Sequence, residues 1–166
     1  MKPIKLKVRK LTREAFAPYG DVIEIAGSRH WTTNQGFAER YHDLAKLDLT
    51  GKGGRPLVSV FRAKPRSMPL RIEIMERHPL SSQAFVPMTP GSFLVVVAKA
   101  GKAPLATDLV CFKTSGSQGV NYARGTWHHP LIALKARTDF LTIDRGGKGE
   151  NYDEILYEDV EIVVAV

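Results

Sequence analysis

Cysteine and long apolar runs are the features that this sequence has least of. Cys111 is the only cysteine among 166 residues, so no disulfide can form within the chain. A lone thiol agrees with the reducing cytoplasm, where we expect the protein to act, and its apolar surroundings predict a buried structural residue. The longest apolar run, residues 93–98, is far shorter than the roughly twenty residues that span a bilayer. No membrane association is therefore expected.

Acidic and aromatic residues are also few beside the basic ones. Lysine and arginine number 24 against 17 acidic residues, which gives a net charge of +7, and aromatic residues make up 8%. The basic residues are scattered, without interleaved aromatic side chains or a recognisable DNA-reading helix, so we expect no nucleic-acid partner. The charge serves solubility, and it also favours a small anionic substrate, because arginine can clamp a carboxylate through two parallel hydrogen bonds.

Helical patterns are scarce, whereas turn residues are frequent. Fourteen glycines and ten prolines separate short β-rich runs, and this pattern predicts an all-β sandwich or barrel. One domain is expected over residues 1–166, since this length suits a single core. Short helices are predicted from Thr12, as a cap, to Phe16 and over residues 151–156. Strands are predicted around residues 4–8 and over 21–25, 56–62, 70–78, 84–87, 92–98, 109–113, 131–136 and 140–144.

The stretch from residue 70 to residue 88 is the most informative. With a period of two, one strand face carries Leu70, Ile72, Ile74, Glu76 and His78, and the other carries Arg71, Glu73, Met75 and Arg77. The apolar face is expected to be buried, so Glu76 and His78 extend it inward, where Gln83 arrives from the next strand. A carboxylate, an imidazole and an amide inside a barrel predict a functional site. The alternative is a hydrogen-bonded barrel mouth without chemistry.

A second polar segment spans residues 121–130. After a turn at Gly125, a strand resumes, so His128 and His129 should point to opposite faces and only one can enter the barrel. A His-x-x-x-x-Gln segment followed by Gly-x-x-His is what a two-motif metal-binding jelly roll displays, and imidazole binds Ni, Zn, Fe or Cu well. The alternative is a core histidine satisfied by hydrogen bonds.

Two further segments hold candidate anion clamps. Arg40 is the first candidate, and the alternative is an arginine that is solvated or paired with Glu39 or Asp43 at the surface. Asp144 and Arg145 end a strand before a double-glycine turn. They are expected either to form a salt bridge that orders the barrel rim or to contact the substrate.

At these segments the sequence resembles the ureidoglycolate lyase family of cupin-like jelly rolls. The likeness covers most of the chain and rests on residues 40–45, 76–80, 83–88, 119–122, 127–131 and 138–147. It implies a cupin-like jelly-roll β-barrel with a few short helices. It also implies release of urea from (S)-ureidoglycolate to give glyoxylate, late in allantoin degradation, by a homodimer that uses nickel and no organic cofactor.

The expected metal ligands differ from those of the wider cupin pattern at two positions. Glu76 stands where that pattern has its first histidine, His78 matches the second, Gln83 replaces the usual glutamate, and His128 falls near the late histidine. A neutral amide is a weaker ligand than a carboxylate for hard cations, and Glu76 partly restores the charge.

The resemblance also suggests roles. Glu76, His78 and His128 are the expected catalytic residues, and which is acid and which is base stays open. Arg40, with Arg145 in reserve, is expected to hold the substrate carboxylate. Gln83 or Asn34 is expected to bind the urea amide of the substrate, and Trp127 is expected to exclude water from the site. Competing functions are a metal-dependent cupin oxygenase or isomerase and a non-catalytic protein that binds a small carboxylate.

Overall fold

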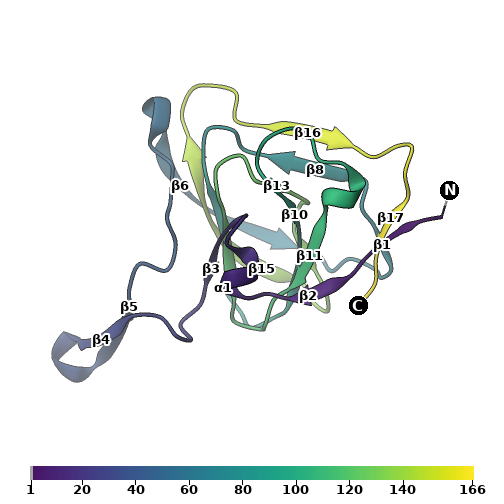
Figure 1. The fold of residues 1–166 in the computed structure, drawn as a ribbon. Coiled ribbons are helices and arrows are strands. Elements are labelled where there is room, and N and C mark those ends of the chain that lie inside the picture. Colours follow the sequence, from purple (N-terminus) through teal and green to yellow (C-terminus); the bar gives the residue numbers. More distant parts are fainter. Residues whose placement is uncertain (1) are drawn as a thin grey trace.

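The structure is a computed structural model that describes residues 2–166, and strands dominate it (Figure 1). A seven-stranded sheet runs in the order β16 (Asp153–Leu156), β8 (Ile74–Arg77), β13 (Trp127–His128), β10 (Phe93–Ala98), β11 (Val110–Lys113), β2 (Val8–Lys10), and β14 (Ile132–Ala133) also pairs with β10. A five-stranded sheet runs in the order β3 (Gly20–Ile23), β12 (Gly119–Tyr122), β9 (Gln83–Pro87), β15 (Thr138–Gly146), β6 (Arg55–Ala63).

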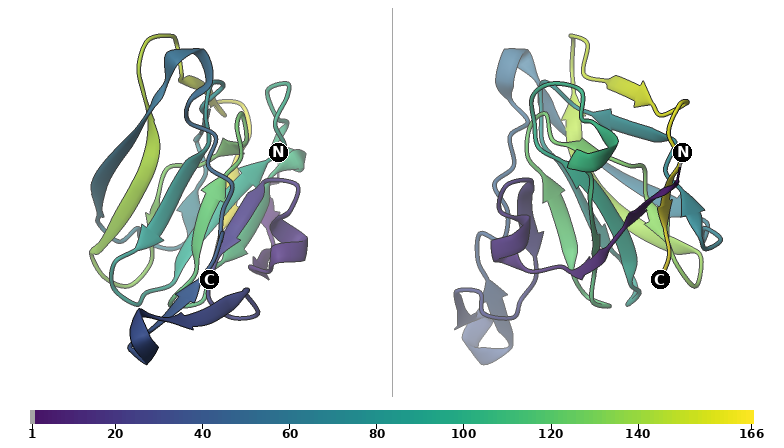
Figure 2. Two further views of the ribbon diagram at one scale, coloured as in Figure 1. Left: turned by 90° about the vertical axis from the view of Figure 1, so that its left-hand side faces the viewer. Right: turned by 45° about the vertical axis from the view of Figure 1, so that its right-hand side comes forward.

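Smaller elements flank the two main sheets. A three-stranded sheet joins β1 (Ile4–Leu6), β17 (Ile162–Val164) and β7 (Leu70–Arg71), and a hairpin is formed by β4 (His30–Thr33) and β5 (Ala38–Tyr41). This hairpin projects away from the barrel (Figures 1 and 2). The helices are α1 (Arg13–Phe16) and three 3-10 turns, η1 (Asn34–Gly36), η2 (Gly51–Gly53) and η3 (Ala106–Asp108).

The core lies on both faces of β10. Phe93, Val95 and Val97 face the five-stranded sheet and pack in one buried cluster with Phe85 and Phe140. The intervening residues of β10 face the other way, into a second cluster that includes residues of β7, β8, β16 and β17 or their flanks. Burial on both faces explains why β10 reads as an unbroken apolar run, and it makes this strand the rigid centre of the barrel.

Most of the fold prediction is confirmed. The structure is an all-β jelly roll with short helices, and Thr12 caps α1 by accepting a hydrogen bond from the Ala15 amide at 3.2 Å. Cys111 is buried, and burial raises the pKa of its thiol to about 12. In residues 2–166, no helix is both long and apolar enough to cross a membrane.

Two predicted elements are wrong. Residues 151–156 do not form a helix, because 153–156 pair with β8 as strand β16, where cross-strand bonds replace helical ones. The strand predicted over 131–136 is reduced to the two residues of β14, which bond to β10.

The predicted faces of residues 70–78 are partly wrong. Met75 was assigned to the exposed face, yet it is fully buried, together with Ile72, in the cluster outside the seven-stranded sheet. Residues 72–73 lie between strands that belong to different sheets, β7 and β8, so the period of two is interrupted there. Glu76 therefore faces the inside while its neighbour Met75 faces the outer core.

Arg145 orders one rim of the barrel. Arg145 is 7% exposed, and its guanidinium donates to the backbone oxygens of Gly51 at 3.1 Å, Lys52 at 3.2 Å and Lys148 at 3.0 Å. The predicted salt bridge with Asp144 is wrong, since the hydrogen bond that Asp144 accepts comes from the Gln83 amide. A buried cation held by several carbonyls stabilises the loops that it joins.

We expect Arg145→Lys to lower the free energy of unfolding by about 2 kcal/mol. The planar guanidinium reaches all three backbone carbonyls, whereas a lysine ammonium cannot. Arg71→Lys is the matched control, since Arg71 forms an exposed pair with Glu73 at 3.5 Å, which contributes about 0–1 kcal/mol. Urea unfolding measures both variants. Equal free energies of unfolding for the two variants would show that Arg145 does not hold the rim.

Candidate functional site

The site is built on a single cross-strand pair. In the antiparallel ladder between β8 and β13, Glu76 stands directly opposite His128. Side chains of directly opposed residues share a sheet face and touch, and Glu76 Oε1 lies 3.4 Å from His128 Nε2. His78 follows β8 by one residue, and its ring centroid lies 5.4 Å from that of His128. Strand register thus brings the three expected catalytic residues together.

Backbone oxygens fix the orientation of both histidine rings. His78 Nδ1 lies 2.8 Å from the Asn151 oxygen, and His128 Nδ1 lies 3.0 Å from the Thr126 oxygen. With Nδ1 turned to the backbone, His128 directs its Nε2 toward Glu76 and His78 directs its Nε2 toward Gln83. His128 also stacks on Tyr122, with ring centroids 4.1 Å apart and planes inclined by 7°.

These residues fit a metal ion. One ligand atom from each of Glu76, His78 and His128 lies within 4.8 Å of the others. His128 Nε2 is buried and has no hydrogen-bond partner, which is costly for a polar atom that nothing uses. Histidines held by backbone carbonyls through the other nitrogen are typical of metal sites. His78 Nε2 lies 3.1 Å from Gln83 Oε1, so the fourth expected ligand lies beside the cluster.

Charge within the cluster keeps Glu76 ionised. Burial raises the pKa of its carboxyl, but the contact with His128 and the charges of His128 and His78 outweigh that effect, so the pKa lies below its ordinary value. Burial, followed by the nearby Glu76 charge, raises the pKa of the Tyr122 phenol. The site therefore presents a carboxylate next to a phenol that keeps its proton.

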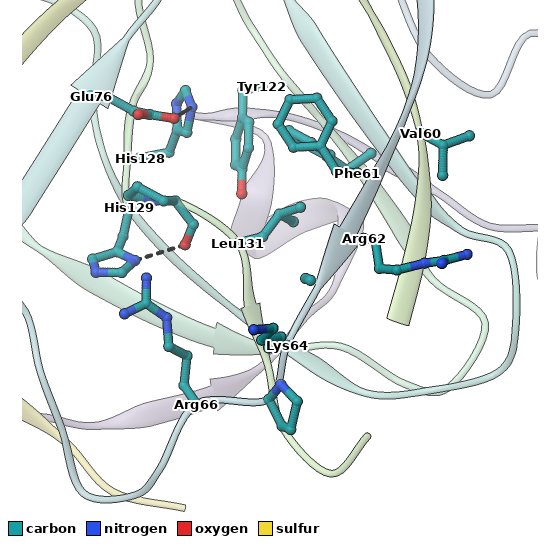
Figure 3. Close-up of a pocket in the computed structure, with 14 residues that line it drawn as sticks. Val60, Phe61, Arg62, Lys64, Arg66, Glu76, Tyr122, His128, His129 and Leu131 are labelled. Carbon is teal, nitrogen blue, oxygen red and sulfur yellow. Dashed lines mark hydrogen bonds and ion pairs between the residues drawn. The ribbon is translucent and has the colours of Figure 1, made fainter. Parts of the chain in front are cut away.

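A cavity of about 620 Å³ opens beside this cluster and is shown in Figure 3. Glu76, Tyr122 and His128 line it, and so does His129. The prediction that only one histidine of the pair faces inward is wrong, because β13 ends at His128 and the alternation does not extend to the next residue. Burial lowers the pKa of His129, and the nearby Arg66 charge lowers it further.

The cavity also has a cationic side that the sequence did not reveal. Lys64 and Arg66 line it from the segment after β6 (Figure 3). Arg62 lines it too, but its guanidinium is bound to both oxygens of Asp139 at 2.8 and 2.9 Å. The sequence signal for this segment was only a run of alternating basic residues, which is equally typical of a solvated surface.

Several expected substrate-binding residues do not line this cavity. Arg40 and Asn34 lie on the projecting hairpin, where the Arg40 guanidinium is 5.5 Å from the Trp31 ring. Trp127 packs in the outer core, with Arg77 over its ring at 4.7 Å.

Two expected residues are instead tied to neighbouring polar groups. Arg145 is bonded to backbone carbonyls, and Gln83 links His78 to Asp144. The structure therefore groups the predicted catalytic residues but not the predicted substrate contacts.

Comparison with known proteins identifies the family to which the chain belongs. Residues 3–165 match the family model described as ureidoglycolate lyase. A ureidoglycolate lyase of Burkholderia mallei (strain NCTC 10229) is 54% identical over 149 residues, 90% of this chain and 87% of that protein, and one of Pseudomonas aeruginosa (strain LESB58) is 49% identical over 156 residues, 94% and 92% of the two chains.

Among solved structures, the epimerase RmlC of Legionella pneumophila Philadelphia 1 matches with a TM-score of 0.42 and 15% identity, over 81% of this chain and 79% of that chain. The family match and the sequence relatives span nearly all of the chain. On that extent of similarity, the chain belongs to the ureidoglycolate lyase family.

Proposed function

We propose that the protein cleaves (S)-ureidoglycolate to glyoxylate and urea, a late step of allantoin degradation that salvages purine nitrogen, and that it does so in the cytoplasm. The observation that carries this proposal is the cluster of Glu76, His78 and His128 ligand atoms within 4.8 Å at one end of a cavity. Membership of the ureidoglycolate lyase family supports the choice of substrate.

The cleavage needs one proton moved and no oxidant. The proton leaves the substrate hydroxyl as its C–O bond becomes C=O, and the C–N bond breaks with its electron pair left on the urea nitrogen. Glu76 is ionised and can accept the proton. Because hydroxyl and nitrogen share one carbon, the same carboxylate can return the proton to the departing nitrogen. His78 and His128 lie beside Glu76 in the site, and Tyr122 offers a hydrogen bond from its phenol.

We also propose that the cluster holds a divalent metal, with Ni²⁺ as the family's expected ion. Glu76, His78 and His128 would bind it, with Gln83 beside them. A bound cation lowers the pKa of a coordinated hydroxyl and stabilises the negative oxygen that forms. The unpartnered Nε2 of His128 supports this assignment.

We propose further that the protein is a homodimer joined along β6. This strand pairs only with β15 in the described part of the chain, so its other edge is open. Val58 is 71% and Val60 55% exposed, and a long apolar edge strand readily pairs with another chain. A two-fold axis at Ser59 would set Val58 beside the partner's Val60 and Leu57 beside the partner's Phe61, without opposing like charges.

The lyase proposal is tested by anaerobic incubation of the purified protein with ureidoglycolate. We expect glyoxylate and urea in equal amounts, and a lower rate after chelation of metal. Turnover without oxygen excludes an oxygenase, and a non-catalytic carboxylate binder yields neither product. Absence of both products would contradict the proposal.

We expect His78→Ala to reduce the turnover number about tenfold or more, which is roughly 1.4 kcal/mol of barrier. His30→Ala is the matched control, because His30 lies on the projecting hairpin and is exposed. Steady-state assays of urea release measure both, with circular dichroism to verify folding. A His78→Ala rate near that of the unaltered protein would remove His78 from the mechanism.

We expect calorimetric titration of the metal-free protein with Ni²⁺ to show one site per chain. His128→Ala should weaken the affinity about tenfold or more, since it deletes a proposed ligand atom. His30→Ala should bind as the unaltered protein does. Equal affinity in both variants would place the metal elsewhere.

We expect sedimentation equilibrium to show a dimer that Val58→Lys converts to monomer, because each lysine would stand opposite the partner's Val60 in the apolar seam. Ile25→Lys is the control, since Ile25 is 58% exposed but lies outside β6. A dimer that persists in the Val58 variant would place the interface on another surface.

A further inference from the structure

The proposed substrate carries a carboxylate, and a charged hydrogen-bond donor is the group that holds a carboxylate best. Arg40 and Arg145, the two arginines expected to do so, do not line the cavity. Other basic side chains line it instead, and the sequence did not single them out.

We propose that Arg66, with Lys64 beside it and His129 as its neighbour, forms the carboxylate-binding subsite of this cavity. This inference rests on the proposed function, because it assigns the binding of that same substrate. Of the three arginine and lysine side chains that line the cavity, Arg62 is already bound by Asp139 through both carboxylate oxygens. Arg66 and Lys64 have no ion pair within residues 2–166.

The backbone of this segment is fixed although its side chains are exposed. The Arg66 amide donates to the Ala133 oxygen at 2.9 Å, and Pro65 forms a β-bridge with Ala133. Ala133 belongs to β14, which is hydrogen-bonded to the buried strand β10. The base of the Arg66 side chain is thus anchored to the core, while its long exposed stem lets the guanidinium turn onto a bound anion.

The surroundings of the guanidinium suit a planar anion. Figure 3 shows the Arg66 guanidinium beside the His129 ring, on the side of the cavity away from Glu76. His129 Nδ1 lies 2.7 Å from the Pro130 oxygen, which fixes the ring. A guanidinium gives a carboxylate two parallel hydrogen bonds, whereas a lysine supplies a point charge. Leu131 lines the wall between the two ends.

The charges along the cavity then select one orientation of the substrate. The carboxylate faces Arg66 and Lys64, and the hydroxyl and urea nitrogen face Glu76. Reversal would move the carboxylate away from both basic side chains, so this arrangement favours an acid over its uncharged ester. Arg66 is accordingly a specificity-determining residue of the lyase reaction.

The test compares Arg66→Gln with Arg62→Gln, which removes a cavity arginine that is already paired. For ureidoglycolate we expect Arg66→Gln to raise KM about tenfold or more with a smaller change in kcat, because a ground-state contact is lost. The preference for ureidoglycolate over its methyl ester should fall by a similar factor, and Arg66→Lys should recover part of it. Arg62→Gln should keep both values within about threefold.

Direct binding separates this inference from the proposed reaction. Calorimetric titration with glyoxylate needs no turnover, and we expect Arg66→Gln to weaken its affinity about tenfold or more while Arg62→Gln does not. Loss of glyoxylate affinity in the Arg66 variant alone would support the subsite even if ureidoglycolate is not cleaved. Unchanged glyoxylate affinity and an unchanged ester preference would overturn it, as would failure of the unaltered protein to bind glyoxylate.

Discussion

The register between β8 and β13 is the constraint on which the site depends. Because Glu76 stands opposite His128, a carboxylate and an imidazole meet on the inner face of the sheet, and His78 joins them after the strand ends. A slip of one residue would turn Glu76 to the outer face and bring Met75 inward. The buried position of Met75 in the outer core opposes that slip, since exposing it to the cavity would cost its apolar packing.

The register in turn depends on the rigid strand beside it. β13 lies between β8 and β10, and β10 is buried on both faces. Close packing of this kind resists small displacements, so the core holds Glu76 and His128 at a fixed separation. The opposite wall of the cavity is held by β14, which is also bonded to β10. One strand therefore positions both the end of the cavity that carries Glu76 and His128 and the end that carries Arg66.

The sequence predicted the all-β class, the grouping of Glu76, His78 and His128 and the inward direction of Glu76, because these follow from local patterns of period two and from residue types. It failed where non-local pairing decides. The burial of Met75 depends on a break between two sheets, and the direction of the His129 side chain toward the cavity depends on where β13 ends. The hairpin that carries Arg40 pairs residues 30–33 with 38–41, and nothing in the alternation of its residues shows that it leaves the barrel.

The central claim is that the Glu76 carboxylate, set opposite His128, moves the proton in ureidoglycolate cleavage. The most direct measurement is the turnover number of Glu76→Gln, which keeps side-chain size and removes the charge. The account predicts that urea release falls about a hundredfold or more while the thermal unfolding temperature stays close to that of the unaltered protein. Turnover near the original rate in this folded variant would contradict it.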